Sequence, residues 1–265
     1  MKRKMYTYSH DVELLIEIDH DGGRFTSEEH AYAIEKEFSQ TKFKTRENLI
    51  RKYLAHNLDP RLRFLMEFIK ENKYSNILSL GSGSCVNEYF LKMALPGDTK
   101  VVACDFDAFF IHKAKEFFSD EFIGTAEGMG IKPVQFDFFS DSIQELKSKL
   151  QINFDLATFL SSAYVMDDKE FVHFFKQLKE AGVKKIIDFH AGYIDWTQFL
   201  RCYLTPLTKN PLLRRVFRKP IRTYQGKFHG YSRSRSEIRN LYKNSGWNID
   251  KELSIASNKY IAVLS

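Results

Sequence analysis

Two apolar runs constrain this chain most, because the first ends in a pair of glycines and the second, one helix length later, ends in an acid. The first run, Ile77–Leu80, leads into Gly81 and Gly83, and the second, Val101–Cys104, leads into Asp105. Glycine lets the backbone pass close to a ligand because it has no Cβ, and apolar runs of this length are typical of buried strands. The pattern predicts a strand, a glycine turn, a helix and a second strand. Asp105 then follows the turn by roughly 20 residues, where such folds place an acid that binds a ribose.

Strand and helix patterns alternate along the rest of the chain. The predicted helices cover residues 60–72, 86–95, 108–118 and 168–181, and the further strands are Pro133–Asp137, Phe154–Leu160 and Lys184–His190. Each of these strands ends at a polar residue: Asp137, the pair Ser161 and Ser162, and His190. The alternation predicts a parallel α/β sheet, which binds ligands at the carboxyl ends of its strands.

A basic and aromatic segment, residues 192–230, interrupts this rhythm and predicts an inserted lid. A helix that begins at Ser234 or Ser236 follows, because serine is a preferred helix N-cap. Two last strands, Trp247–Ile249 and Lys259–Leu264, are expected to form a closing antiparallel hairpin.

Length and composition fit one globular domain with additions. The 265 residues are 43% hydrophobic, which suffices for a sizeable core. No stretch approaches the ~20 apolar residues of a membrane span, and the first residues lack the apolar core of a signal peptide. The three cysteines include no Cys-x-x-Cys pair, so we expect no metal site and a reducing, cytoplasmic location.

The region before the first strand reads as a separate helical extension or cap, residues 1–59. Its candidate helices are residues 28–40 and 46–57. Tyr32 and Tyr53 lie on them, either as contacts to a bound molecule or as ordinary packing residues.

This order of elements resembles the class I S-adenosylmethionine-dependent methyltransferases, over residues 60–265. The resemblance implies the α/β fold of that superfamily: a Rossmann-like, seven-stranded, mostly parallel sheet with helices on both faces and an antiparallel last strand. It implies an enzyme with S-adenosyl-L-methionine as cofactor. Two positions depart from the family's loop, since Ser79 stands where an acid is usual and Cys85 where a third glycine is frequent. A dehydrogenase is disfavoured, because Val86 occupies the place of the third glycine of the dinucleotide pattern.

The resemblance also implies which residues contact the cofactor. The glycine loop, with Gly81, Ser82 and Gly83, would run under the methionine part of the cofactor. Asp105, after the second strand, would hold the ribose hydroxyls, and Asp137 of the third strand would bond the adenine amino group. Phe106 and Phe138 would sandwich the adenine, and Ser161 after the fourth strand is a further contact.

Three residues are candidates for the chemistry. His190, at the expected carboxyl end of the fifth strand, is the first choice for a general base, because the pKa of an unperturbed histidine lies near neutrality. His229 is the second choice, and Tyr164 is placed to orient an acceptor. A histidine at a strand end is also a frequent structural hydrogen-bonding residue. A hydroxyl acceptor would need a base, whereas a phosphate or carboxylate would not.

Charge and absent motifs narrow the methyl acceptor. The net charge is +6, and the lid carries arginines such as Arg214 and Arg215, whose side chains bind phosphate bidentately. We expect O-methyl transfer to a small polar or anionic acceptor: a sugar, phosphate, carboxylate or nucleotide-linked molecule. An RNA methyltransferase is an alternative, but Leu160–Tyr164 replaces the Asn/Asp-Pro-Pro-aromatic motif of enzymes that methylate amino groups of nucleic acids. A module that binds the cofactor without transferring a methyl group is the other alternative. The sequence makes no prediction of oligomeric state.

Overall fold

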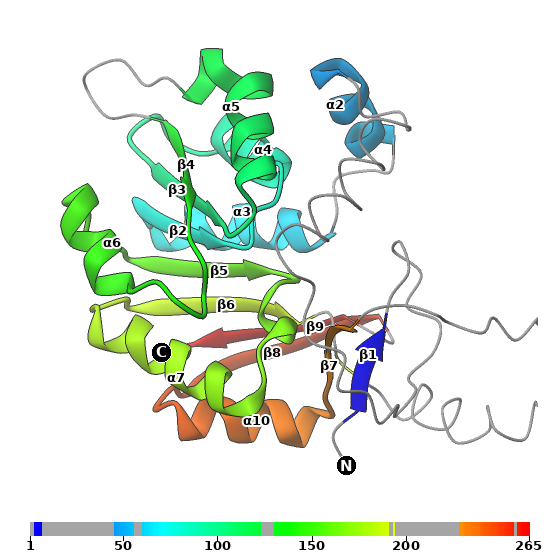
Figure 1. The fold of residues 1–265 in the computed structure, drawn as a ribbon, viewed down its shortest axis with the longest axis vertical. Coiled ribbons are helices and arrows are strands. Elements are labelled where there is room, and N and C mark those ends of the chain that lie inside the picture. Colours follow the sequence, from blue (N-terminus) through cyan, green and yellow to red (C-terminus); the bar gives the residue numbers. More distant parts are fainter. Residues whose placement is uncertain are drawn as a thin grey trace, which may run out of the picture.

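The central sheet of the molecule has seven strands and is mostly parallel (Figure 1). The computed structural model describes residues 3–6, 45–55, 60–122, 130–190, 193, 228–256 and 259–265. In spatial order the strands are β4 (Ile131–Gln135), β3 (Lys100–Asp105), β2 (Asn76–Leu80), β5 (Leu156–Leu160), β6 (Lys185–His190), β9 (Lys259–Leu264) and β8 (Ile249–Ala256). The neighbouring strands among β4, β3, β2, β5 and β6 pair in parallel, and β9 is antiparallel to both of its neighbours, β6 and β8. The predicted Rossmann-like sheet with its antiparallel last strand is confirmed.

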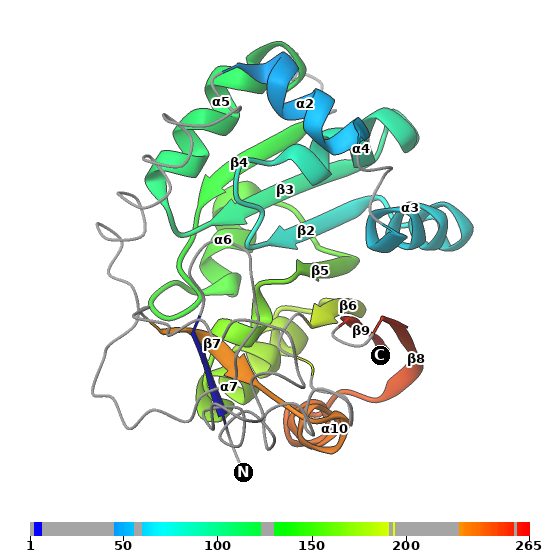
Figure 2. The same ribbon diagram turned by 90° about the vertical axis from the view of Figure 1, so that its right-hand side faces the viewer.

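Helices cover both faces of the sheet, because each buried strand presents apolar side chains to both sides. Ile77 of β2 packs into the core of one face, and Leu78 and Leu80 pack into the core of the other. The first face carries α3 (Pro60–Asn72), α4 (Val86–Ala94) and α5 (Ala108–Phe122); the second carries α6 (Ile143–Leu150), α7 (Asp168–Glu180) and α10 (Arg235–Asn244), as Figure 2 shows.

The order of the strands reverses between β2 and β5. From β2 the chain builds outward through β3 to β4, and it then returns to β5 on the other side of β2 and continues to β6. In open α/β sheets, ligands bind outside the carboxyl ends of the strands at such a switch point. The glycine turn that follows β2 therefore lies where the fold favours a ligand.

Helix ends follow the predicted signals closely. Of the two serines considered as the cap of α10, Ser234 is the one in place: its hydroxyl accepts from the backbone N–H of Glu237 at 3.4 Å, and the Glu237 carboxylate accepts from the N–H of Ser234 at 2.7 Å. Helix α7 ends at Glu180, just before Gly182, as predicted.

Some elements differ from the prediction. The third strand is Ile131–Gln135, so Asp137 lies two residues beyond its end rather than on it. Trp247 precedes β8 instead of belonging to it, because its indole N–H donates to the carbonyl of Phe175 at 2.8 Å and its ring is buried. The sequence analysis missed α6, and it missed a small antiparallel sheet of β1 (Arg3–Tyr6) and β7 (Phe228–Ser232).

Several predicted segments lie outside the described residues. These are the helix expected at 28–40 with Tyr32, and most of the lid at 192–230 with Arg214 and Arg215. Helix α2 (Arg46–Ala55) matches the second expected helix, but the side chain of Tyr53 is not described. The division at residue 59 remains a prediction. Among the described helices, none has the length and apolar character of a membrane span.

We predict that Ser234→Ala destabilises the protein by about 1 kcal/mol, because it leaves backbone N–H groups at the start of α10 without their cap. Urea unfolding measures this change. Ser236→Ala is the matched control, since that hydroxyl lies in the same turn but does not cap the helix, and it should change the free energy of unfolding by only a few tenths of a kcal/mol, as exposed positions usually do. Equal effects of the two variants would contradict the assignment of the cap.

Candidate active site

The glycine loop between β2 and α4 is tied to the end of β3. The N–H groups of Gly81 and Ser82 both donate to the carbonyl of Cys104, at 2.8 and 2.9 Å, and the Ser82 hydroxyl donates to the same oxygen at 3.1 Å. Gly81 has a φ of +73°, and a Cβ on it would overlap the side chain of Ser162. The Ser162 hydroxyl in turn donates to the carbonyl of Leu80 at 2.6 Å. The loop is therefore fixed against both neighbours of β2.

Asp105 organises the second half of the loop. One carboxylate oxygen accepts from the N–H of Gly83 at 2.8 Å, and the other accepts from the N–H of Asp107 at 3.1 Å. Gly83 has a φ of +54°, and apart from its chain neighbours no atom of the described residues lies within 4 Å of the position that its Cβ would take. The loop thus presents an open face beside a nearly buried carboxylate.

The two departures from the family's loop have clear structural roles. Ser79 leaves room for Glu88 from the first turn of α4, and the Ser79 hydroxyl donates to Oε1 of Glu88 at 2.5 Å. Cys85 adopts a φ of +58° at the start of α4, which is the left-handed conformation that glycine adopts at the lowest energetic cost. Burial raises the pKa of the Cys85 thiol well above its usual range, so it stays protonated.

Glu88 is a fully buried acid beneath the loop. Among the described residues, its Oε2 has no hydrogen-bond partner. Burial raises the pKa of Glu88 to about 7 against the opposing hydrogen bonds from Ser79 and its own backbone, with a further increase from the nearby Asp105 carboxylate. The sequence analysis missed Glu88. The absence of the usual acid at Ser79 was the signal that another acid fills this region.

Of the adenine-contact candidates, Phe138 lies beside the glycine loop. The Asp137 carboxylate accepts from the N–H of Phe139 at 3.0 Å and from the Ser140 hydroxyl at 3.3 Å, so it shapes the turn after β4. Phe138 packs 5.2 Å from Phe174, and its ring lies 3.6 Å from the position of a Cβ on Gly81. The Phe106 side chain is half-buried at the end of β3.

Ser161 and Ser162 connect β5 to the opposite side of the loop. Ser161 has a φ of +68°, which is uncommon for a residue with a Cβ, and its hydroxyl accepts a hydrogen bond from Arg61 of α3. The contact from Arg61, on a helix of the first face of the sheet, therefore stabilises Ser161 in this uncommon conformation.

His190 is the last residue of β6 and is buried. Its Nδ1 lies 3.2 Å from Oδ2 of Asp188, and the Tyr242 hydroxyl donates to the same oxygen at 2.6 Å. The sequence analysis missed Asp188 and Tyr242. The Asp-Phe-His ending of the strand was the available signal, because residues two apart in a strand share a face.

The remaining catalytic candidates lie near β7. Tyr164 is buried, its burial raises the pKa of its phenol, and its ring packs so closely on Gly230 that a Cβ there would overlap it. His229 is in β7, but its side chain is outside the described residues.

A further missed residue, Arg233, is buried directly after β7. Its guanidinium donates to the carbonyl of Met166 at 2.6 Å, pairs with Asp168 at 3.1 Å, and lies 5.6 Å from the centre of the Phe171 ring. Buried arginines are rare unless paired, so the position of Arg233 is determined by these contacts.

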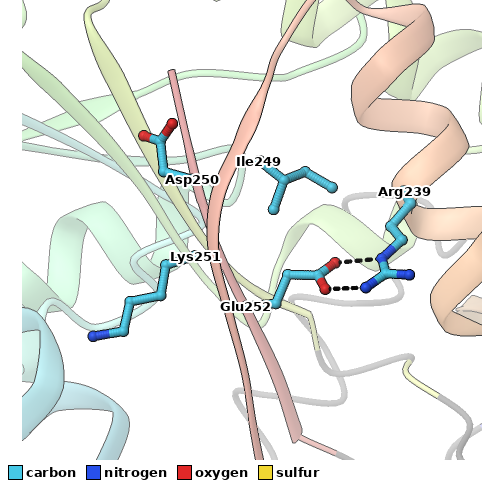
Figure 3. A pocket seen from close by; sticks show the side chains of 5 residues that line it. All are labelled: Arg239, Ile249, Asp250, Lys251 and Glu252. Carbon is cyan, nitrogen blue, oxygen red and sulfur yellow. Dashed lines mark hydrogen bonds and ion pairs between the residues drawn. The ribbon is translucent and has the colours of Figure 1, made fainter.

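A hollow of about 260 Å³ lies elsewhere, between the edge strand β8 and α10 (Figure 3). Figure 3 shows Glu252 and Arg239 facing each other there, with Nε of Arg239 2.7 Å from the carboxylate. Hydrogen bonds from Arg239, Tyr260 and Arg235 lower the pKa of Glu252 to about 2, so its charge is already compensated. The hollow shares no residue with the glycine loop, and we do not assign the site to it. In the part of the chain that the structure describes, no cluster of His, Cys, Asp or Glu is arranged to hold a metal ion.

Solved structures share this fold. A putative O-methyltransferase from Nostoc punctiforme matches with a TM-score of 0.55 and 12% identity over 83% of this chain and 59% of that one. Human N-acetylserotonin methyltransferase in complex with S-adenosylmethionine matches with a TM-score of 0.53 and 13% identity over 88% of this chain and 59% of that one. Magnesium protoporphyrin IX methyltransferase from Synechocystis, with bound S-adenosylhomocysteine, matches with a TM-score of 0.53 and 14% identity over 88% and 97%.

These likenesses define the class of fold. The chain has the fold of the class I S-adenosylmethionine-dependent methyltransferases, as its sequence pattern predicts. It spans about three fifths of the length of the first two of these proteins. No family model matches the chain, and no curated protein sequence is significantly similar to it.

We predict that the charge of Glu88 makes stability depend on pH. Because folding raises the pKa of this acid from 4.5 to about 7, the folded state favours its protonated form. The stability that the protonated Glu88 gives the folded state is fully present below pH 4.5. It is lost as the pH rises to about 7, and the free energy of unfolding falls by about 3 kcal/mol in total.

Glu88→Gln keeps the shape and removes the titration. Denaturant unfolding at pH 5 and pH 8 should show a larger loss of stability for the wild type than for the variant. The same difference between the two pH values in both proteins would rule out a buried, titrating Glu88.

Proposed function

We propose that this chain is an S-adenosylmethionine-dependent methyltransferase. The observation that carries the proposal is the loop at the switch point of the sheet. Gly81 packs so closely against Ser162 there that a Cβ on the glycine would overlap the serine side chain, and Asp105 accepts a hydrogen bond from the backbone of Gly83. The open space beside Gly83 and the nearly buried Asp105 carboxylate at the end of β3 fit a nucleoside with two ribose hydroxyls.

The chain's own residues divide the work of holding the cofactor. Gly81, Ser82 and Gly83 would lie along its methionine part, because their backbone is fixed to β3 and carries no bulky side chain on the open face. Asp105 would accept from the ribose. The adenine would lie toward the segment after β4, which carries Asp137 and Phe138, with Phe106 and Ser161 as further contacts.

When bound, S-adenosylmethionine supplies an activated methyl group on a sulfonium sulfur. The protein then needs to align the acceptor and, for a hydroxyl, to take its proton. His190 is our candidate for that proton acceptor, because it ends β6 on the side of the sheet where an acceptor would approach the switch point. Tyr164 lies on a segment next to β7 and would help to orient the acceptor, and His229 of β7 remains our second candidate for the base.

We further propose O-methyl transfer to a small polar or anionic acceptor in a reducing cytoplasm. Supporting this choice, the chain carries a net charge of +6, which favours an anionic molecule. The two described cysteines, Cys85 and Cys104, are buried free thiols, which suits a reducing compartment.

We predict that Asp105→Ala weakens S-adenosylmethionine binding by about 2 kcal/mol or more, since charge-assisted hydrogen bonds are worth ~1.5–3 kcal/mol each. Isothermal titration calorimetry measures this. Asp137→Ala should weaken binding less, because one hydrogen bond to the adenine is at stake. Asp98→Ala, at an exposed aspartate before β3, is the surface control and should bind as the wild type does. Wild-type affinity in Asp105→Ala would remove the basis of the site assignment.

The acceptor class is tested with methyl-labelled cofactor and a cell extract. We expect the label in a small-molecule fraction that survives ribonuclease treatment, and we expect transfer to fall with added salt if the acceptor is anionic. Label in RNA would favour the RNA methyltransferase instead. Tight cofactor binding without transfer to any fraction would favour a binding module.

A further inference from the structure

A buried trio of polar side chains lies at the carboxyl end of β6, on the face covered by α7 and α10. Asp188 and His190 are two residues apart in the strand, so their side chains lie on the same face. Tyr242 of α10 reaches the same carboxylate. All three are at most 1% exposed. The charge of Asp188 is thus buried and bonded to two different partners.

The trio leaves two polar atoms without a hydrogen bond in the described structure: Nε2 of His190 and Oδ1 of Asp188. A buried polar group without a partner typically costs about 1–3 kcal/mol. A trio that only filled the core would therefore be a poor substitute for apolar side chains, since Phe171 and Phe175 already pack around this region. The unpartnered ring nitrogen points to a role beyond packing.

The hydrogen bonds determine which nitrogen of His190 carries the proton. An ionised carboxylate only accepts, so at the 3.2 Å contact with Oδ2 it is Nδ1 that donates. The Tyr242 hydroxyl also donates to Oδ2, and burial raises the pKa of Tyr242 well above its usual range, which keeps this donor protonated. Nε2 of a neutral His190 is then left with its lone pair, as a proton acceptor.

In the part of the chain that the structure describes, the other neighbours of His190 do not compete for this nitrogen. The ring of Phe171 from α7 packs edge-on to the imidazole at 6.3 Å, and Tyr260 from β9 is its partner in the sheet. The Tyr260 hydroxyl donates to Glu252. The nearby cation, Arg233, is paired with Asp168.

We propose that Asp188, with Tyr242, is a positioning residue that holds His190 in the Nδ1–H tautomer and so presents Nε2 as the base for a hydroxyl acceptor. This inference rests on the proposed function. The acceptor's hydroxyl proton moves to Nε2, and the electrons of the broken O–H bond stay on the acceptor oxygen. The imidazolium that forms carries a positive charge, which the Asp188 carboxylate stabilises.

Nitrogen-15 NMR of the full chain labelled at histidine tests the tautomer directly. At pH 8.5, where an ordinary histidine is neutral, we expect the His190 signals of the Nδ1–H form, assigned by their loss in His190→Gln. Asp188→Asn should raise the population of the Nε2–H form, because a carboxamide can also donate to Nδ1. His173, which is exposed on α7, is the internal control and should not change.

The wild-type spectrum alone decides the central point. An Nε2–H tautomer of His190 in the wild type would overturn the proposal, even if Asp188→Asn failed to fold. Tyr242→Phe keeps the carboxylate, and we expect it to retain the Nδ1–H tautomer. Loss of that tautomer in Tyr242→Phe would overturn the primary role given to Asp188.

Transfer rates separate a positioning role from a structural one. With labelled cofactor and a small-molecule extract, Asp188→Asn should lower the rate by about 10²–10⁴-fold, as for loss of a general base, while calorimetric affinity for S-adenosylmethionine stays at the wild-type value. Unchanged transfer would overturn the inference and leave the proposed function standing. A wild type that binds no cofactor would instead contradict the proposed function.

Discussion

The rest of the site depends on one carbonyl oxygen, that of Cys104 at the end of β3. It accepts from the N–H groups of Gly81 and Ser82 and from the Ser82 hydroxyl, and so holds the glycine loop of β2 down onto the neighbouring strand. Only then can the N–H of Gly83 reach the carboxylate of Asp105, which follows Cys104 in the chain. The acid is thus positioned by the loop, and the loop by the strand that carries the acid.

The fold was predictable because its signal is local. Apolar runs such as Ile77–Leu80 mark strands buried on both faces, and the glycines and acids after them mark the carboxyl ends where a doubly wound sheet binds its ligand. The end of a strand was less predictable where a side chain decides it. The Asp137 carboxylate accepts a hydrogen bond from the N–H of Phe139 and so shapes a turn, and the strand ends two residues earlier than predicted. Pairs that are brought together only by folding, such as β1 with β7, leave no local signal at all.

The departures at Ser79 and Cys85 show why a motif is weaker evidence than the backbone it implies. Cys85 replaces a glycine of the family pattern, yet its φ of +58° keeps the left-handed turn, at the cost that a Cβ brings to that conformation. Ser79 lacks the usual acid, yet Glu88 places a carboxyl group against it from the next helix. The geometry of the loop is preserved with different residues, so the sequence departures do not argue against a nucleotide site.

In the proposed function, the distance between the glycine loop after β2 and His190 at the end of β6 would limit the size of the acceptor. Neighbouring strands are ~4.8 Å apart, so the end of β6 lies about 10 Å from the end of β2, with β5 between them. The glycine loop occupies the first of these ends and His190 the second. In the function we propose, the reacting hydroxyl would have to lie between these two strand ends. The short distance between the two strand ends therefore favours, within the proposed function, a small acceptor whose hydroxyl fits between the glycine loop and His190.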